Sequence, residues 1–184
     1  MESIRIVTER LRLDPLRLRD AEPFFHNRSD PAVARYQMWR PVSIEEVREF
    51  ITQQQALVPG TPGAWFQLGI RLLASEALIG DAGVHLPTGQ ERQAEIGVTI
   101  APEFQGKGFA TEAVRALLSH LFEALRMHRV YASVDPRNLP SLRLMERIGM
   151  RREAHFRESL WFRGAWVDDL VFALLESEWN KPGA

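Results

Sequence analysis

The middle of the sequence, from residue 107 to residue 125, carries apolar residues at the spacing of one face of an α-helix. These residues are Ala110, Ala113, Val114, Leu117, Leu118, Leu121, Phe122 and Leu125. Such a stripe predicts a long helix that buries one face in a core. Just upstream, apolar and polar residues alternate over 94–100, which predicts a strand. Because only a short turn joins the two, the fold must place a buried strand and a long helix in direct succession.

The N-terminal part of the chain predicts a strand followed by a short helix. Polar and apolar residues alternate over 8–13, as they do in a half-buried strand, and Pro15 is expected to end it. Asp20 stands where it can cap a helix whose Phe24 and Phe25 face inward.

A second helix and a β-hairpin are predicted next. Ser43, followed three residues later by Glu46, is a capping-box pattern that opens a helix over 44–56. Two runs rich in β-forming residues, 65–73 and 78–86, are separated by three residues. That spacing is typical of two antiparallel strands joined by a tight turn.

The C-terminal part predicts a strand over 130–134, a helix over 138–148 with Asn138 as its cap, and a terminal hairpin. The hairpin is predicted from two β-like runs, 153–162 and 166–175. In sum, the pattern indicates a mixed α/β fold with a central, mostly antiparallel sheet and helices on both faces. With 184 residues and no linker-like stretch, residues 1–184 are expected to form one domain.

Composition excludes several classes of protein. The chain has no cysteine, which excludes disulfides, thiolate metal sites and a cysteine nucleophile. The net charge is -1 with acids and bases intermixed, which argues against a nucleic-acid partner. No apolar run is long enough to cross a membrane, and the N-terminus lacks the pattern of a secretory signal. A cytoplasmic protein without a membrane partner is expected.

The turn between the central strand and the long helix contains Gly106, Lys107 and Gly108. Free N–H groups at a helix N-terminus and the partial positive charge there favour bound anions, and Lys107 would add a full charge. Two interpretations remain open: a phosphate cradle, or merely a tight turn between strand and helix. A Walker phosphate loop is excluded because Gly108, not Ser or Thr, follows the lysine, and the dinucleotide fingerprint is incomplete.

The same stretch resembles the acetyl-CoA signature of the GNAT acetyltransferases, in its Rim-type branch of ribosomal-protein N-terminal acetyltransferases. The signature is Gln or Arg, two variable residues, Gly, one variable residue, then Gly or Ala. A second Rim-type motif is similar to residues 135–150, and residues 8–11 resemble the usual start of that branch. The residues that match the signature are Gln105, Gly106, Lys107, Gly108, Phe109 and Ala110.

The resemblance implies a binding site for acetyl-CoA. Main-chain amides from Gln105 to Ala110 would hold the pyrophosphate, with Thr111 next to them in the first helical turn. The backbone of Val98, Thr99 and Ile100 would pair with the pantetheine arm like an added strand. Asn138 would contact pantetheine as well as cap its own helix.

The resemblance also suggests two catalytic residues, each with a second interpretation left open. An amine attacks a thioester only when neutral, so some group must accept its proton. Glu95 is the candidate base, directly or through water, although a strand carboxylate in an ion pair is the alternative. Ser141 is the candidate acid for the leaving thiolate, although a first-turn serine can simply bond to local backbone.

Histidine and tryptophan give weaker signals. The five histidines have no helical pairing, so no metal site is expected. His85 and His155 are candidates for the wall of an acceptor pocket, with a structural role as the alternative. Trp39 and Trp161 fall in segments that border the acceptor site in similar proteins, and neither is expected to be catalytic.

The function predicted from the sequence is therefore direct transfer of acetyl from acetyl-CoA to a primary amine, on a small molecule or a protein N-terminus. Two alternatives remain: a non-catalytic module that binds acyl-CoA, and a nucleotide-binding regulator. The aromatic-rich terminal hairpin makes a homodimer an expectation as well. The residues that would select the acceptor carry no readable code.

Overall fold

The computed structural model describes residues 4–179 of the chain. Strands dominate it, and helices are inserted between them. The strands are β1 (Ile6–Val7), β2 (Leu11–Pro15), β3 (Trp65–Leu72), β4 (Leu78–His85), β5 (Gln93–Ile100), β6 (Arg129–Val134), β7 (Arg151–Phe162) and β8 (Ala165–Leu175). The α-helices are α1 (Ala21–Ser29), α2 (Pro31–Ala34), α3 (Ile44–Ala56), α4 (Phe109–Ser119), α5 (Leu139–Arg147) and α6 (Glu176–Trp179). Shorter helical turns are η1 (Leu18–Asp20), η2 (Pro102–Phe104) and η3 (His120–Ala124).

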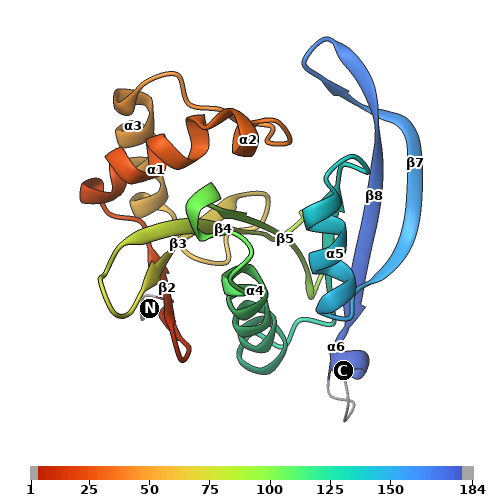
Figure 1. Ribbon diagram of the computed structural model, residues 1–184. Coiled ribbons are helices and arrows are strands. Elements are labelled where there is room, and N and C mark those ends of the chain that lie inside the picture. Colours follow the sequence, from red (N-terminus) through yellow and green to blue (C-terminus); the bar gives the residue numbers. More distant parts are fainter. Residues whose placement is uncertain (1–3, 180–184) are drawn as a thin grey trace.

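All the described strands join one eight-stranded sheet in the order β1-β2-β3-β4-β5-β6-β8-β7. Every neighbouring pair is antiparallel except β5 and β6, which run parallel. Helices α1 and α3 cover one face, and α4 covers the other (Figure 1). The predicted mixed sheet with helices on both faces is confirmed.

The predicted long helix is confirmed, with shifted ends. Helix α4 begins at Phe109 because Gly108 has a φ of 82°, a left-handed conformation that stops the helix from starting earlier. It buries Val114, Leu117 and Leu118 against the inward face of the sheet, where each side chain contributes about 1.5–3 kcal/mol. The last turn, η3, is a π-helix, which the period of the sequence does not distinguish from an α-helix.

A second apolar cluster fixes α1 and α3 on the opposite face. Phe24 of α1 and Ile51 of α3 are buried in it, and Phe24, Trp39 and Phe50 contact one another with ring centroids 4.6–6.1 Å apart. Phe25 is only partly buried beside them. This cluster holds the segment between α1 and α3 over the sheet.

Asp20 occupies the N-cap position of α1, as predicted, but its side chain does not cap the helix. The carboxylate of Asp20 makes no bond to that helix and instead accepts two hydrogen bonds from Arg71, at 2.7 and 2.6 Å. Arg71 is almost fully buried, and Asp14 accepts from it at 2.7 Å. A buried guanidinium must find acceptors, so the Asp20 carboxylate turns to Arg71 and not to α1, while it also accepts from the main-chain N–H of Arg17 at 2.7 Å.

The predicted capping box of α3 forms in half. Ser43 Oγ accepts from the main-chain N–H of Glu46 at 3.1 Å. The Glu46 carboxylate, however, accepts from the N–H of Val42 and from the indole of Trp39, both at 2.7 Å. Glu46 thereby anchors Trp39 as well as the helix.

Several local features at the N-terminus and the C-terminal hairpin differ from the predictions. The strand predicted over 8–13 is β2, which begins later, at Leu11, and ends at Pro15 as expected. The short β1 and α2 were not predicted. The β7–β8 hairpin reaches well beyond the rest of the sheet (Figure 1). At its turn, Arg163 donates to the main-chain oxygen of Ala34 at 2.7 Å. This hydrogen bond connects the tip of the β7–β8 hairpin to the helical segment that contains α2.

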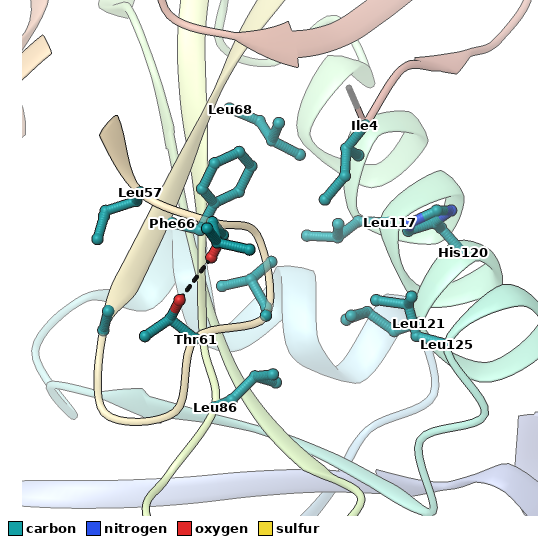
Figure 2. A pocket seen from close by; sticks show the side chains of 14 residues that line it. Ile4, Leu57, Thr61, Phe66, Leu68, Leu86, Leu117, His120, Leu121 and Leu125 are labelled. Atoms are coloured by element: carbon teal, nitrogen blue, oxygen red, sulfur yellow. Dashed lines mark hydrogen bonds between the residues drawn. The ribbon is translucent and has the colours of Figure 1, made fainter. Parts of the chain in front are cut away.

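A small, partly open apolar pocket of about 30 Å³ lies where α4 passes into η3 (Figure 2). Its wall is apolar apart from Thr61, which donates to the carbonyl oxygen of Val58, and His120. The Nε2 atom of His120 is buried and has no hydrogen-bond partner among the described residues. None of the described helices is both long enough and apolar enough to span a bilayer.

Candidate active site

A cavity of about 550 Å³ opens between the sheet, the α1–α3 segment and the terminal hairpin. Trp39 and Phe50 line it from the helical side, Trp65 lines it from β3, and Phe162 lines it from β7. Because aromatic side chains form much of its wall, it can exclude water from a bound ligand.

The floor of the cavity is the place where β5 and β6 separate. The two strands pair only up to Glu95 and Tyr131, although β5 continues to Ile100 and β6 to Val134. Residues 96–99 and 132–135 line the cavity beyond that point. Backbone groups on the two facing edges no longer pair with each other, so an extended ligand can bond to them.

Glu95 lies at this point of separation, in a row of side chains on adjacent strands. Its register partners are His85 on β4 and Tyr131 on β6, and His85 pairs in turn with Trp65. The His85 ring stacks on Trp65 at 5.2 Å, and its Nδ1 atom is 3.5 Å from Glu95 Oε2. His85 Nδ1 is buried and makes no hydrogen bond among the described residues, so its contact with the carboxylate is weak.

Burial raises the pKa of Glu95 above that of an ordinary carboxyl group, and the nearby charge of Asp169 adds to the rise. His85 and the Tyr131 hydroxyl act in the opposite direction, without cancelling it. Burial and the charge of Glu95 likewise raise the pKa of Tyr131. A carboxylate with a raised pKa is a stronger base, which suits proton transfer near neutral pH.

Asn138 and Ser141 line the same cavity just after the end of β6. Both belong to the N-terminus of α5, where the side-chain oxygen of Asn138 accepts from the main-chain N–H of Ser141 at 3.3 Å. The predicted cap is therefore confirmed. The structure brings Glu95, Val98, Thr99, Asn138 and Ser141 into one cavity, and they come from two segments about 40 residues apart in the sequence.

The glycine turn lies at the N-terminus of α4, outside the lining of this cavity. Gly106 and Gly108 have φ values of 72° and 82°, which only glycine adopts at little cost. A side chain at Gly106 would meet no atom within 4 Å, so open space lies beside the turn. The amides of residues 109–111, in the first turn of α4, have no intrahelical acceptor and can bind an anion.

Polar side chains of the turn bond back to the chain that precedes it. Gln105 Nε2 donates to the main-chain oxygen of Ile100 at 2.8 Å, so Gln105 and the end of β5 are joined. Lys107 Nζ donates to the main-chain oxygen of Glu103 at 2.8 Å and lies over the Phe104 ring. Lys107 thus leaves the main-chain groups of the turn uncovered.

A cluster formed by the turn between β1 and β2 and by the first turn of α4 holds the glycine turn, and the sequence did not predict it. The Glu112 carboxylate accepts from Thr8 Oγ1 at 2.5 Å, from the Arg10 N–H at 2.9 Å and from Arg10 Nε at 2.6 Å. Arg10 Nη1 also donates to the main-chain oxygen of Lys107 at 3.2 Å, and its guanidinium covers the Phe109 ring. We call Thr8, Arg10 and Glu112 the clasp.

The sequence matches the family described as Acetyltransferase (GNAT) domain over residues 10–151, which include the parting strands, the glycine turn and α5. The chain belongs to the GNAT acetyltransferase family. It is an N-acetyltransferase, and the resemblance read from its central motif is confirmed.

Similar proteins extend over nearly the whole chain. The Uncharacterized N-acetyltransferase YnaD of Bacillus subtilis is 32% identical over 177 residues, which cover 96% of this chain and 100% of YnaD. A GNAT-family acetyltransferase structure from Bacillus anthracis has a TM-score of 0.86 and 31% identity, covering 95% of this chain and 100% of that one. Mycobacterium smegmatis RimJ in complex with CoA-disulfide shares the fold, with a TM-score of 0.82, 24% identity and coverage of 97% and 89%.

Of the residues predicted to line the acceptor pocket of this GNAT chain, the structure places some in the cavity and others outside it. Trp39 lines the cavity, whereas Trp161 is 58% exposed on the hairpin and lies outside the lining. His85 lies behind Glu95, and His155 is exposed and bonded to Asp168 at 2.6 Å. Among residues 4–179, no group of three or more His, Cys, Asp or Glu side chains could hold a metal ion.

Asp169 is a cavity residue that the sequence did not single out. It lies on β8, is only 8% exposed, and lines the cavity next to Ser133. The available signal was a pair of acids, Asp168 and Asp169, inside a run of strand-forming residues. The sequence does not show that this strand lies beside β6 in the sheet.

Proposed function

We propose that this GNAT chain transfers acetyl directly from acetyl-CoA to a primary amine in the 550 Å³ cavity. The observation that carries the proposal is the meeting of Glu95, Asn138 and Ser141 where β5 and β6 part. GNAT acetyltransferases use acetyl-CoA, whose thioester supplies an already activated acetyl group. The role of the chain is then to bind, align and move protons.

We assign cofactor binding to the turn and to the parting strands. The amides of Gly106, Lys107, Gly108, Phe109, Ala110 and Thr111, with Gln105 joining the turn to β5, would hold the pyrophosphate. Their support is the open space beside Gly106 and the uncommitted N–H groups of α4. The backbone of Val98, Thr99 and Ile100 and the side chain of Asn138 would hold the pantetheine arm, supported by the unpaired strand edges.

Glu95 is assigned as the base. The amine nitrogen forms a bond to the acetyl carbon while the carbon–sulfur bond breaks and its electron pair goes to sulfur. The proton of the amine passes to Glu95, directly or through a water, and the raised pKa of that carboxyl group supports this role. Ser141 is assigned as the donor that protonates the departing thiolate, supported by its place on the opposite wall.

The test is release of thiol from acetyl-CoA over a panel of primary amines, including small amines and peptides with free N-termini. Glu95→Gln should lower kcat by about a hundredfold while leaving the KM for acetyl-CoA within about twofold. Glu91→Gln, an exposed glutamate just before β5, is the matched control. Tight binding of CoA with no thiol released by any amine would instead identify a non-catalytic acyl-CoA-binding module.

The predicted single domain over residues 1–184, the cytoplasmic location and the homodimer belong to the same proposal. They rest on composition and on the aromatic hairpin. The relation to the Rim-type branch supports a protein N-terminus as one class of acceptor, beside small amines. Gel filtration of the purified chain tests the dimer directly.

A further inference from the structure

The cavity is unevenly charged. Its lining includes the carboxylates of Glu95, Asp135, Asp168 and Asp169 and a single guanidinium, that of Arg28. Arg28 does not offset them, because it is paired with the buried Asp81 behind the wall of the cavity, with Nε 3.1 Å from Oδ2. An acidic cavity of this kind attracts cations and repels anions.

Two of the four carboxylates pair with a cationic or ionisable side chain at hydrogen-bonding distance, and a third, Glu95, lies 3.5 Å from His85 Nδ1. Asp135 pairs with Arg137 at 2.5 Å, and Asp168 pairs with the His155 ring at 2.6 Å. These two therefore have little need of a ligand.

Asp169 has no such partner within residues 4–179. Its side chain accepts a hydrogen bond from the Ser133 hydroxyl, at 2.6 Å to Oδ1, and no arginine or lysine of residues 4–179 forms an ion pair with it. Yet Asp169 is about nine-tenths buried. Burying a carboxylate costs solvation free energy, and without a nearby cation little in the fold offsets that cost.

Asp169 is also close enough to Glu95 for its charge to act on that carboxyl group. If an amine is bound beside Glu95, a second polar group a few carbons away on the same molecule can therefore reach Asp169. The aromatic and aliphatic wall, which includes Trp39, Trp65 and Val167, suits the methylene groups between two polar ends.

We propose that Asp169 binds a second, positively charged group of the acceptor, so that the site selects amines with two cationic groups over amines with one. The inference rests on the proposed acetyl transfer and names its substrate class. The shared chemistry is an attacking amine joined through a short chain to a second amino group that is protonated near neutral pH. A free diamine and a peptide N-terminus followed by lysine both carry it.

The test compares acceptors of equal length that differ only at the far end. Each α,ω-diamine of about three to six carbons is matched with the alkylamine and the ω-amino acid of the same length. In a second arm, a peptide with lysine after the free N-terminus is matched with one carrying norleucine. The second arm tells whether a small molecule or a peptide is the better source of the cation.

In at least one arm, the native chain should show kcat/KM at least about tenfold higher for the dicationic acceptor than for its neutral match. Amino acids of the same length should be the poorest acceptors, because Asp169 repels their carboxylate. In Asp169→Asn the preference should fall to about threefold or less. The ratio of two acceptors cancels any change in the base, Glu95, that the same substitution causes.

Two controls separate binding from structure. Asp169→Asn keeps an oxygen that can accept from Ser133, so its Tm should stay within about 3 °C of the native value. Glu153→Gln removes a carboxylate of β7 that lies outside the cavity lining and pairs with Arg129 and Arg151, and it should leave the acceptor ratio unchanged.

Equal kcat/KM for dicationic and neutral acceptors in both arms would overturn the inference while the acetyltransferase assignment stands. So would a preference for the dication that survives in Asp169→Asn. Failure of every amine to release thiol would overturn the proposed function itself, and the inference with it.

Discussion

The guanidinium of Arg10 donates a hydrogen bond to the main-chain oxygen of Lys107 at 3.2 Å, across 97 residues of sequence. The same side chain is held by Glu112, at 2.6 Å from Nε to Oε2. A residue just before β2 therefore fixes the conformation of the glycine turn. This contact connects the edge of the sheet with the amides that we assign to the pyrophosphate.

Removing the clasp should weaken cofactor binding more than turnover. Arg10→Gln loses the contact with Lys107 and the cover over Phe109, so the amides of the turn are no longer held in one arrangement. We expect a Kd for CoA about tenfold weaker by calorimetry, with kcat at saturating acetyl-CoA within about threefold. Arg5→Gln, an exposed arginine of the same segment, should change neither quantity. Unchanged CoA affinity in Arg10→Gln would show that the clasp does not hold the turn for cofactor binding.

The conformation of Gly108 gives a second prediction. A side chain there must adopt a φ near 82°, and its Cβ would lie 3.4 Å from Arg10 Nη2. Gly108→Ala should lower the free energy of unfolding by about 1 kcal/mol or more and weaken CoA binding. Gly108→Asn should lose less stability, because Asn tolerates this region better. Equal stability of both variants and the native chain in urea unfolding would refute the strain argument.

The glycine turn and its helix could be predicted from the sequence because the signals are local. The period of α4, the turn of Gly106 and Gly108 and the Asn138 cap all lie within single segments. The predictions failed where a residue distant in the sequence determines the hydrogen bonds of a side chain. Asp20 bonds to Arg71, 51 residues away, in preference to the adjacent helix. Only the folded arrangement reveals such competition.

The candidate site shows the same division. Glu95, Asn138 and Ser141 came from motifs that resemble a family, and the structure places all three in one cavity. Asp169 and the clasp have no motif of their own, and their meaning depends on strand order. Since β8 lies beside β6, Asp169 reaches Ser133 across 36 residues. No spacing rule predicts that contact.

The pH dependence of turnover tests the assignment of Glu95. Because its pKa is raised, the carboxylate becomes protonated at a higher pH than an ordinary glutamate does as the pH falls. With an amine of low basicity, which stays neutral, kcat/KM should fall on the acid side with an apparent pKa above about 4.5. Glu95→Gln should lose this acid limb. An unaltered acid limb in Glu95→Gln would assign the base elsewhere.

His85 should modulate that limb. Its interaction with Glu95 lowers the pKa of the carboxyl group, against the effect of burial. His85→Asn removes this interaction, so the acid limb should move to higher pH while the maximum rate at alkaline pH stays within about threefold. A limb that moves to lower pH, or not at all, would show that His85 does not act on Glu95.

Ser141 is tested by the nature of the leaving group. Ser141→Ala removes the hydroxyl from the first turn of α5, while the Asn138 cap to its main-chain N–H can remain. We expect kcat to fall by about ten- to a hundredfold with acetyl-CoA. An acyl thioester whose thiol is more acidic should lose less, because its thiolate leaves without a proton. Ser159→Ala, an exposed serine of β7, is the control, and equal losses with both thioesters would remove Ser141 as the acid.

The last prediction concerns stability and the small apolar pocket beside α4 (Figure 2). Burial lowers the pKa of His120, so the folded chain keeps this ring neutral while the unfolded chain protonates it more readily. The contribution of the neutral His120 ring to the free energy of unfolding is therefore fully present above the unfolded pKa of about 6.5, and it is lost as the pH falls below that value. Because the ring is partly exposed, solvent screening limits the loss to about 1 kcal/mol, or about 2–4 °C in Tm. His120→Leu should remove this part of the acid dependence, whereas equal losses of Tm between about pH 7.5 and pH 5.5 in both chains would show that His120 is not its source.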